Sequence, residues 1–289
     1  MNRLPSLFVS HGAPTFALEP GIAGPLLTAA ARALPRPQAV LVVSPHWTTH
    51  AVRVSTAPQP ATIHDFGGFD RALYEISYPV KGHPELAQQT VELLRLQGWQ
   101  ASADDRRGLD HGAWVPLRYL YPQADVPVFQ VSMPADLSSG SALALGEALA
   151  PLAEKGVLIV GSGSLTHNLY EFRHGQADEA PYARKFAAWI RDAVQASDRE
   201  RLVNALQLAP HAQRAHPTAE HFLPLLVAVG AAPARLQPSV LAGGMTHGVL
   251  SMESYVFGRE LHLSSDASQN DDGAAAAWWS DPASRKVAS

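Results

Sequence analysis

Histidine gives this chain its chemical character. The 289 residues include 13 histidines and no cysteine. With thiolates absent, imidazole and carboxylate are the only side chains left that bind a transition metal well. Neutral imidazoles suit Zn, Fe, Cu and Ni, whereas sites made only of oxygen suit Mg and Ca. The positions of the histidines therefore decide whether the sequence predicts a transition-metal site.

Three histidines follow apolar runs that are typical of buried strands. His11 ends LFVSH, His46 ends VLVVSPH, and His167 lies a few residues after VLIVGSG. The carboxyl ends of parallel strands form one edge of an open α/β sheet, and ligands bind in the crevice there. The pattern predicts that these three imidazoles gather just past the strand ends at that edge.

His221 is a fourth candidate, far along the chain. The segment 217–221 is predicted to begin a helix with Thr218 as its N-cap, before an apolar run over 222–229. In that first turn Glu220 would favour the positive end of the helix dipole. Three protein ligands with open positions make a catalytic metal site, and four closed ligands make a structural one. With four histidines and Glu220 as candidates, the sequence is compatible with either three or four protein ligands.

The remaining histidines differ in context. His111 lies in LDHGAW and is interpreted as an acid/base residue or a residue beside the metal ligands; a buried structural histidine is the alternative. His64 in TIHDFGGF and His247 beside a glycine could line the substrate pocket, together with the aromatic side chains of Phe66 and Trp47. Surface loops and core packing are the commoner fates of such residues.

Other chemistries fit the sequence less well. The GSGS segment at 161–164 lacks both the G-x-S-x-G pattern of a nucleophile elbow and the lysine of a phosphate-binding loop. A net charge of -4 without a Lys/Arg-rich stripe gives no footprint for nucleic acid. No apolar run approaches the roughly 20 residues of a membrane span, and no targeting segment opens the chain. We expect a soluble, cytoplasmic protein without nucleic-acid or membrane partners.

The elements that must position these residues alternate between strands and helices. The predicted strands cover 39–44, 52–55, 126–132 and 157–161, and the predicted helices cover 21–34, 84–96, 139–153 and 181–196. This order is typical of a single-domain, layered α/β/α fold around a largely parallel, mixed central sheet. A late strand within 250–257 is expected to pair antiparallel. We expect a catalytic domain over 1–263 and a disordered or loosely packed tail over 264–289.

Six ordered sequence blocks resemble the class III extradiol ring-cleavage dioxygenases, closest to the DOPA 4,5-dioxygenase branch. They are HGAP at 11–14, SPHW at 44–47, TIHDFGGF at 62–69, LDHGAW at 109–114, GSGSLTHNL at 161–169 and AEHFLPLLVAVGAA at 219–232. The similarity runs from about Leu4 to about Gly258 and excludes the tail.

The resemblance implies a set of metal ligands. His11 and His46 match two histidines that hold a mononuclear non-haem metal, and the block AEHFLP supplies the third ligand. His221 is our choice for that ligand, with Glu220 as the second choice. Three ligands on one face leave open positions for a bidentate substrate and O2. Fe(II) is the expected metal, and Zn(II) can occupy the same histidine site.

The resemblance also implies an acid/base pair. His167 matches a histidine drawn either as a further ligand or as the active-site base, and His111 matches one that contacts the substrate and assists proton transfer. The implied reaction is cleavage of a catechol ring by O2 to a ring-opened semialdehyde. A zinc-dependent hydrolase and a non-catalytic metal-binding interaction protein of the same fold are the alternatives. The identity of the catechol is open, and a homo-oligomer is compatible with the sequence.

Overall fold

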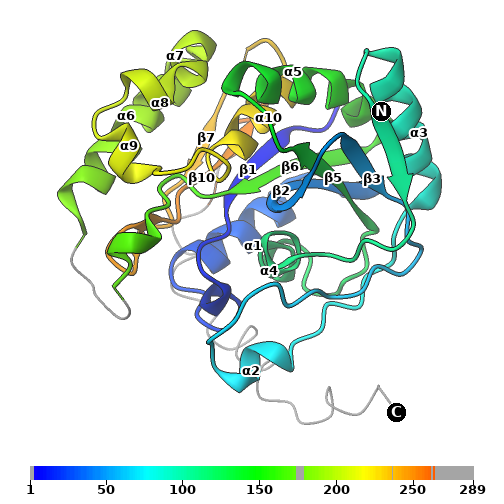
Figure 1. Cartoon of the computed structure of the whole chain (residues 1–289), viewed down its shortest axis with the longest axis horizontal. Helices are drawn as coiled ribbons and strands as arrows, with labels where there is room; N and C mark the ends of the chain where they lie inside the picture. Colours follow the sequence, from blue (N-terminus) through cyan, green and yellow to red (C-terminus); the bar gives the residue numbers. More distant parts are fainter. Residues whose placement is uncertain (1–2, 174–178, 236, 262, 264–289) are drawn as a thin grey trace.

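The computed structural model describes residues 3–173, 179–235, 237–261 and 263, and they form an α/β/α fold around one eight-stranded sheet (Figure 1). The predicted tail over 264–289 lies outside the described residues. Across the sheet the strands run in the order β4 (Ala101–Asp104), β3 (Val52–Ser55), β5 (Val128–Pro134), β2 (Ala39–Thr49), β6 (Val157–Gly163), β1 (Ser6–Ser10), β10 (Ser254–Phe257) and β7 (Ser239–Leu241). The four central strands, from β5 to β1, are parallel.

The edges of the sheet make it mixed. Strand β10 pairs antiparallel with β1, β7 pairs antiparallel with β10, and β3 pairs antiparallel with β5. The expected antiparallel pairing of the late strand is therefore confirmed. The two outer strands β4 and β7 were not predicted, since they are short and β4 reads ASAD, with no β-branched residue to mark it.

Helices cover both faces of the sheet. Figure 1 shows α3 (Pro84–Leu96), α5 (Ser139–Leu149) and α10 (Leu223–Ala231) on one side, and α1 (Ala23–Ala33) and α4 (His111–Leu120) on the other. A hydrophobic core lies on each face of the sheet, and alternate residues of β2 point into the two cores. Leu41 and Val43 pack with the first group of helices, and Val40 and Val42 pack with the second. Successive side chains of a strand point to opposite faces of the sheet, and here helices cover both faces. A strand of this kind therefore has an uninterrupted apolar sequence.

The other elements are shorter or peripheral. They are α2 (Arg71–Tyr74), α6 (Pro181–Gln195), α7 (Arg199–Val203), α8 (Ala205–Leu208), α9 (Ala212–Ala215), the hairpin strands β8 (Met245–Thr246) and β9 (Leu250–Ser251), and the 3-10 turns η1 (Pro14–Ala17), η2 (Ala150–Lys155) and η3 (Leu169–Glu171). In the part of the chain that the structure describes, no helix is long and apolar enough to cross a membrane.

Two local predictions at the functional edge are wrong. Strand β2 does not stop before His46; its pairing with β5 shifts register after Val43 and resumes at Thr48, so His46 lies inside the strand at an irregularity. Helix α10 begins at Leu223 without a side-chain cap, so Thr218 is not an N-cap and His221 precedes the helix. Pro224 explains this start, because proline favours the first turn of a helix.

Glycines of the GSGS segment let His221 and the first turn of α10 lie directly on β6. A Cβ atom on Gly161 would lie 2.0 Å from the carbonyl oxygen of Pro224, and one on Gly163 would lie 2.3 Å from that of His221. Real Cβ atoms do not tolerate such distances, so only glycine allows this approach. The segment therefore serves packing, and it fixes the backbone of His221 against the sheet.

Candidate metal centre

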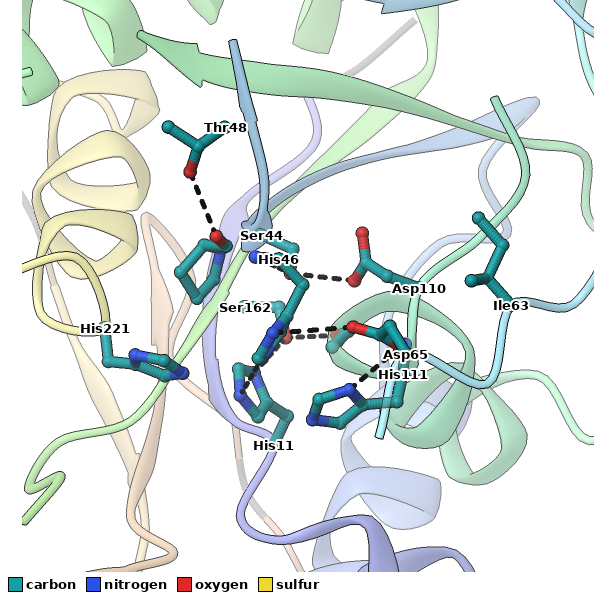
Figure 2. Close-up of polar contacts among 12 residues, drawn as sticks. His11, Ser44, His46, Thr48, Ile63, Asp65, Asp110, His111, Ser162 and His221 are labelled. Carbon is teal, nitrogen blue, oxygen red and sulfur yellow. Dashed lines mark hydrogen bonds and ion pairs between the residues drawn. The ribbon is translucent and has the colours of Figure 1, made fainter. Parts of the chain in front are cut away.

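Three imidazoles converge at the carboxyl edge of the central strands. The Nε2 atoms of His11 and His46 are 3.2 Å apart, and the ring centroid of His221 lies 5.5 Å from that of His11 and 5.1 Å from that of His46 (Figure 2). One potential ligand atom of each residue lies within 4.8 Å of the others. The structure thus brings together the residues that the resemblance implies as metal ligands.

Backbone contacts fix the positions of two of these histidines. The amide of His11 donates to the carbonyl of Gly163 at 2.9 Å, and the amide of Ser164 donates to the carbonyl of His221 at 2.9 Å. Gly12, with φ of 63°, turns the chain away directly after His11, in a conformation that favours glycine. The end of strand β6 therefore holds both candidate ligands, although it contributes neither.

The Nδ1 atom of each of the three histidines faces an oxygen. His11 Nδ1 is 3.0 Å from Ser162 Oγ, His46 Nδ1 is 3.5 Å from Asp65 Oδ2, and His221 Nδ1 is 3.0 Å from Glu220 Oε1. Because the Ser162 hydroxyl donates to the carbonyl of Gly112, its oxygen accepts from His11 Nδ1. A proton on Nδ1 leaves the Nε2 lone pair available for a metal, as outer hydrogen bonds do in metalloproteins.

An unpartnered nitrogen atom is a second observation, after the convergence of the three imidazoles, that fits a bound transition metal. His221 Nε2 is buried and has no hydrogen-bond partner, which is costly unless another group uses its lone pair. His11 and His221 are 1% and 7% exposed. A metal ion bound by the three Nε2 atoms would use that orphaned atom. Neutral nitrogen ligands with no cysteine suit Fe(II) and Zn(II) alike.

Burial keeps these imidazoles neutral. It is the main cause that lowers the pKa of His11 and His221 well below 6.5, with further lowering from the neighbouring histidines. Burial and then His111 lower the pKa of His46 to about 4, against smaller opposing effects of Asp110 and Asp65. Since a metal binds the neutral form of histidine, the site is in its ligand form at neutral pH.

Buried neutral histidines also predict how the metal-free protein responds to acid. Burial lowers the pKa of His216, which lies outside the ligand set, from 6.5 to about 4. The unfolded chain then binds the proton more readily, so stability falls as the pH drops from 6.5 to 4, by about 3 kcal/mol for this one residue. Urea unfolding of metal-free protein at pH 7, 6 and 5 should show this fall.

Two variants separate the contribution of His216. In His216→Gln the free energy of unfolding should depend less steeply on pH between 6.5 and 4, by the contribution of about one proton. In His50→Gln, at an exposed position, the dependence should be that of the wild type. An unchanged slope in His216→Gln would contradict the assignment.

His111 lies beside the ligand group at the first turn of α4. Its ring centroid is 4.0 Å from that of His46 and 5.5 Å from that of His11. Asp65 Oδ1 accepts from the His111 amide at 2.9 Å and lies 3.0 Å from His111 Nδ1. Burial raises the pKa of Asp65, but the contacts with His111 outweigh this and lower it to about 2. Asp65 is therefore a fixed negative charge beside two imidazoles.

A buried carboxylate, Asp110, ties β2 to the start of α4. It accepts from Ser44 Oγ at 2.8 Å, from Gln130 Nε2 at 2.8 Å and from Arg107 Nη2 at 2.9 Å. Arg107 Nη2 also donates to the carbonyl of His46 at 3.0 Å. A fully buried carboxylate needs such partners, and here they hold the backbone beside His46 and His111.

His167 stacks on His221. The two ring centroids are 3.5 Å apart and the rings are nearly parallel, at 8°. Burial lowers the pKa of His167 to about 4, although Glu220 opposes the shift. The loop that carries His167 is held by its amide, which donates to the carbonyl of Ala215 at 2.8 Å.

The predicted pocket residues divide into two groups. Phe66 packs edge-on against His111 with centroids 5.7 Å apart. His64 packs against Phe66, and its Nε2 donates to the carbonyl of Ile76 at 2.9 Å. Phe66 therefore borders the histidine cluster, and His64 is connected to the cluster through Phe66.

Trp47 and His247 make contacts farther from His111. Trp47 is buried, and the Arg107 guanidinium lies 5.2 Å from its ring centroid. His247 stacks on Phe172 at 4.4 Å and its Nε2 is 3.4 Å from Thr15 Oγ1. Their place in a substrate pocket stays a prediction.

Sequence reasoning missed the residues that orient the histidines. Asp65, Asp110 and Ser162 each contact a histidine or its backbone support, yet none was assigned a role. The available signal was position: Asp65 follows His64 in an aromatic loop, Asp110 directly precedes His111, and Ser162 lies in a strand whose neighbour ends just before His11.

Comparison with known proteins agrees with this site. Residues 25–258 match the family model described as the catalytic LigB subunit of aromatic ring-opening dioxygenase. The chain is 38% identical over 260 residues to a 4,5-DOPA dioxygenase extradiol of Beta vulgaris, covering 89% of this chain and 97% of that protein. It is 36% identical over 268 residues to a protein of that name in Escherichia coli K12, covering 89% and 96%.

A solved structure gives the same answer for the fold. The crystal structure of uncharacterized protein JW3007 from Escherichia coli K12 is 31% identical and superposes with a TM-score of 0.72, covering 89% of this chain and 100% of that one. The fold and the histidine cluster define an α/β protein with a candidate metal centre. The chain belongs to the LigB family of aromatic ring-opening dioxygenases, in the extradiol class and its DOPA dioxygenase-like branch.

Proposed function

We propose that this protein cleaves a catechol with O2 at an Fe(II) ion held by His11, His46 and His221. The observation that carries the proposal is the convergence of these imidazoles, each with an oxygen at Nδ1. Bound there, Fe(II) supplies open coordination positions and the electronic means to join a singlet catechol to O2. Glu220 orients His221 in this proposal and is not itself a ligand.

His167 acts as the base. His221 would hold the metal through the lone pair of its Nε2 atom, which lies in the plane of the imidazole ring. The parallel ring of His167 is 3.5 Å away, so its in-plane lone pair does not reach the same ion. Stacking therefore supports three protein ligands over four. Neutral His167 is free to take a proton from a catechol hydroxyl.

His111 contacts the substrate in this proposal. Asp65 engages its Nδ1 side, so Nε2 is the atom presented to a bound catechol. Phe66 stands edge-on to the His111 ring and offers an apolar wall for the aromatic substrate. Burial of the cluster limits water, which strengthens each polar contact to the substrate.

The reaction inserts both atoms of O2. The ring C–C bond beside the diol breaks; the hydroxyl-bearing carbon becomes a carboxylate and its neighbour becomes an aldehyde. His167 and His111 hold and return protons so that the product forms as the hydroxy-semialdehyde. No external reductant is needed, because the catechol supplies the four electrons that reduce O2.

Oxygen uptake tests the proposal. Protein loaded with Fe(II) without air, then given a catechol and O2, should consume one O2 per catechol and form a yellow product. DOPA and protocatechuate are the first substrates to compare, since the relatives from Beta vulgaris and Escherichia coli carry the name 4,5-DOPA dioxygenase extradiol. Ester or amide hydrolysis with Zn(II) and no oxygen uptake with Fe(II) would indicate a hydrolase. Metal binding without either activity would indicate an interaction protein.

A further inference from the structure

Asp65 contacts two histidines that have different tasks. Its Oδ1 accepts from the backbone amide of His111 at 2.9 Å and lies 3.0 Å from His111 Nδ1, while its Oδ2 lies 3.5 Å from His46 Nδ1 (Figure 2). The side chain is 21% exposed, on a loop between β3 and α2. One carboxylate thus faces the Nδ1 atoms of a proposed ligand and of the proposed substrate-contact residue.

We infer that Asp65 is a positioning residue that sets the tautomers of His46 and His111 together, so that both present Nε2 to the centre. The inference rests on the proposed function for the tasks of the two histidines. The negative charge of Asp65 lies 3.0 Å from His111 Nδ1 and 3.5 Å from His46 Nδ1, and it favours a proton over a lone pair on each of these atoms by charge attraction, although the His111 ring N–H is not aligned for a hydrogen bond. Only then is the Nε2 lone pair of His46 free for the metal.

Asparagine at this position makes the inference testable, because its amide has one acceptor and one donor. The backbone amide of His111 needs an acceptor at the Oδ1 position, so the amide oxygen stays there. The NH2 group then faces His46 Nδ1 and requires a lone pair on it. That arrangement moves the His46 proton to Nε2, the atom that must bind the metal.

Alanine at position 65 removes the contacts without forcing a tautomer. Because the Asp65 side chain is partly exposed, water can accept from both Nδ1 atoms in Asp65→Ala. The expected order of metal affinity is therefore wild type, then Asp65→Ala, then Asp65→Asn. The steric similarity of Asn to Asp would predict the opposite order of the two variants if Asp65 only filled space.

The experiment measures metal affinity without turnover. Co(II) and Zn(II) affinities are determined by competition with a chromophoric chelator, and the Co(II) absorption spectrum reports the ligand set. Asp65→Asn should bind about 10- to 100-fold more weakly than wild type, with a changed Co(II) spectrum. Asp70→Asn is the matched control: Asp70 caps α2 by accepting from the Ala72 amide, asparagine caps equally well, and wild-type affinity should remain.

The outcomes separate the two proposals. If Asp65→Asn binds Co(II) as tightly as Asp65→Ala or wild type, with an unchanged spectrum, the inference about tautomers is overturned. If wild type binds metal but takes up no O2 with any catechol, the proposed function fails, while the order of metal affinities still tests Asp65. If Asp65→Asn does not fold, Asp65→Ser replaces it in the test. The serine hydroxyl can rotate to accept or donate, so this variant forces no tautomer and should bind metal within a few-fold of Asp65→Ala. A metal affinity 10-fold or more below that of Asp65→Ala would count against the inference.

Discussion

His46→Ala is expected to lose the metal and ring cleavage together. His46 supplies an Nε2 atom 3.2 Å from that of His11, inside a site that has three proposed protein ligands. Removing one of three ligands leaves two imidazoles, and we expect metal affinity to fall by on the order of 10³-fold or more, above the 10- to 100-fold cost of losing an outer partner. Metal analysis after gel filtration and oxygen uptake measure the two effects.

His50→Ala is the control for this prediction. His50 is exposed and directly follows β2, so its replacement changes the same region without touching the cluster. It should retain full metal content and turnover. A His46→Ala protein that keeps stoichiometric Fe(II) would contradict the assignment of His46 as a ligand.

His167→Phe is expected to keep the metal and lose turnover. Phenylalanine preserves an aromatic ring against His221 and removes the nitrogen that accepts the proton. Loss of a general base costs about 10²- to 10⁴-fold, so kcat should fall by that factor while KM changes little. Metal content, the Co(II) spectrum and steady-state kinetics distinguish this from loss of a ligand.

Chemical rescue sharpens the assignment of the base. In His167→Ala, added imidazole should restore part of the turnover, because a free base can enter the space left beside His221. His111→Ala should also keep metal and lose turnover, but imidazole should not restore its substrate positioning. Loss of metal in His167→Phe would instead make His167 a fourth ligand.

The sequence predicted the elements that deliver the histidines because their signals are local. The apolar runs before His11 and after Val157 are buried strands, and the parallel pairing of β1, β2 and β6 brings their ends together. The alternation of strands and helices predicted the layered fold for the same reason. His221 could be marked as a candidate from its predicted helix start, but its choice as the third ligand needed the AEHFLP block, since its approach to the cluster depends on packing of α10 over β6.

The contacts among side chains could not be predicted in the same way. Asp65 and His111 are 46 residues apart, and Ser162 and His11 are 151 residues apart, so no local pattern links them. The course of β2 past Pro45 also depends on a tertiary interaction, because Thr48 and Thr49 pair with β5 beyond the irregularity. Local propensity marks a break there, and pairing with a neighbouring strand overrides it.

The two glycines of β6 beneath His221 link metal binding to the packing of the protein interior. Gly161 and Gly163 let the backbone around His221 lie directly on β6, so the position of this proposed ligand depends on the packing of α10 on the sheet. A change in the packing of that layer would therefore move His221 relative to His11 and His46. Metal retention would then depend on the packing of α10 against the sheet as well as on the three imidazoles themselves.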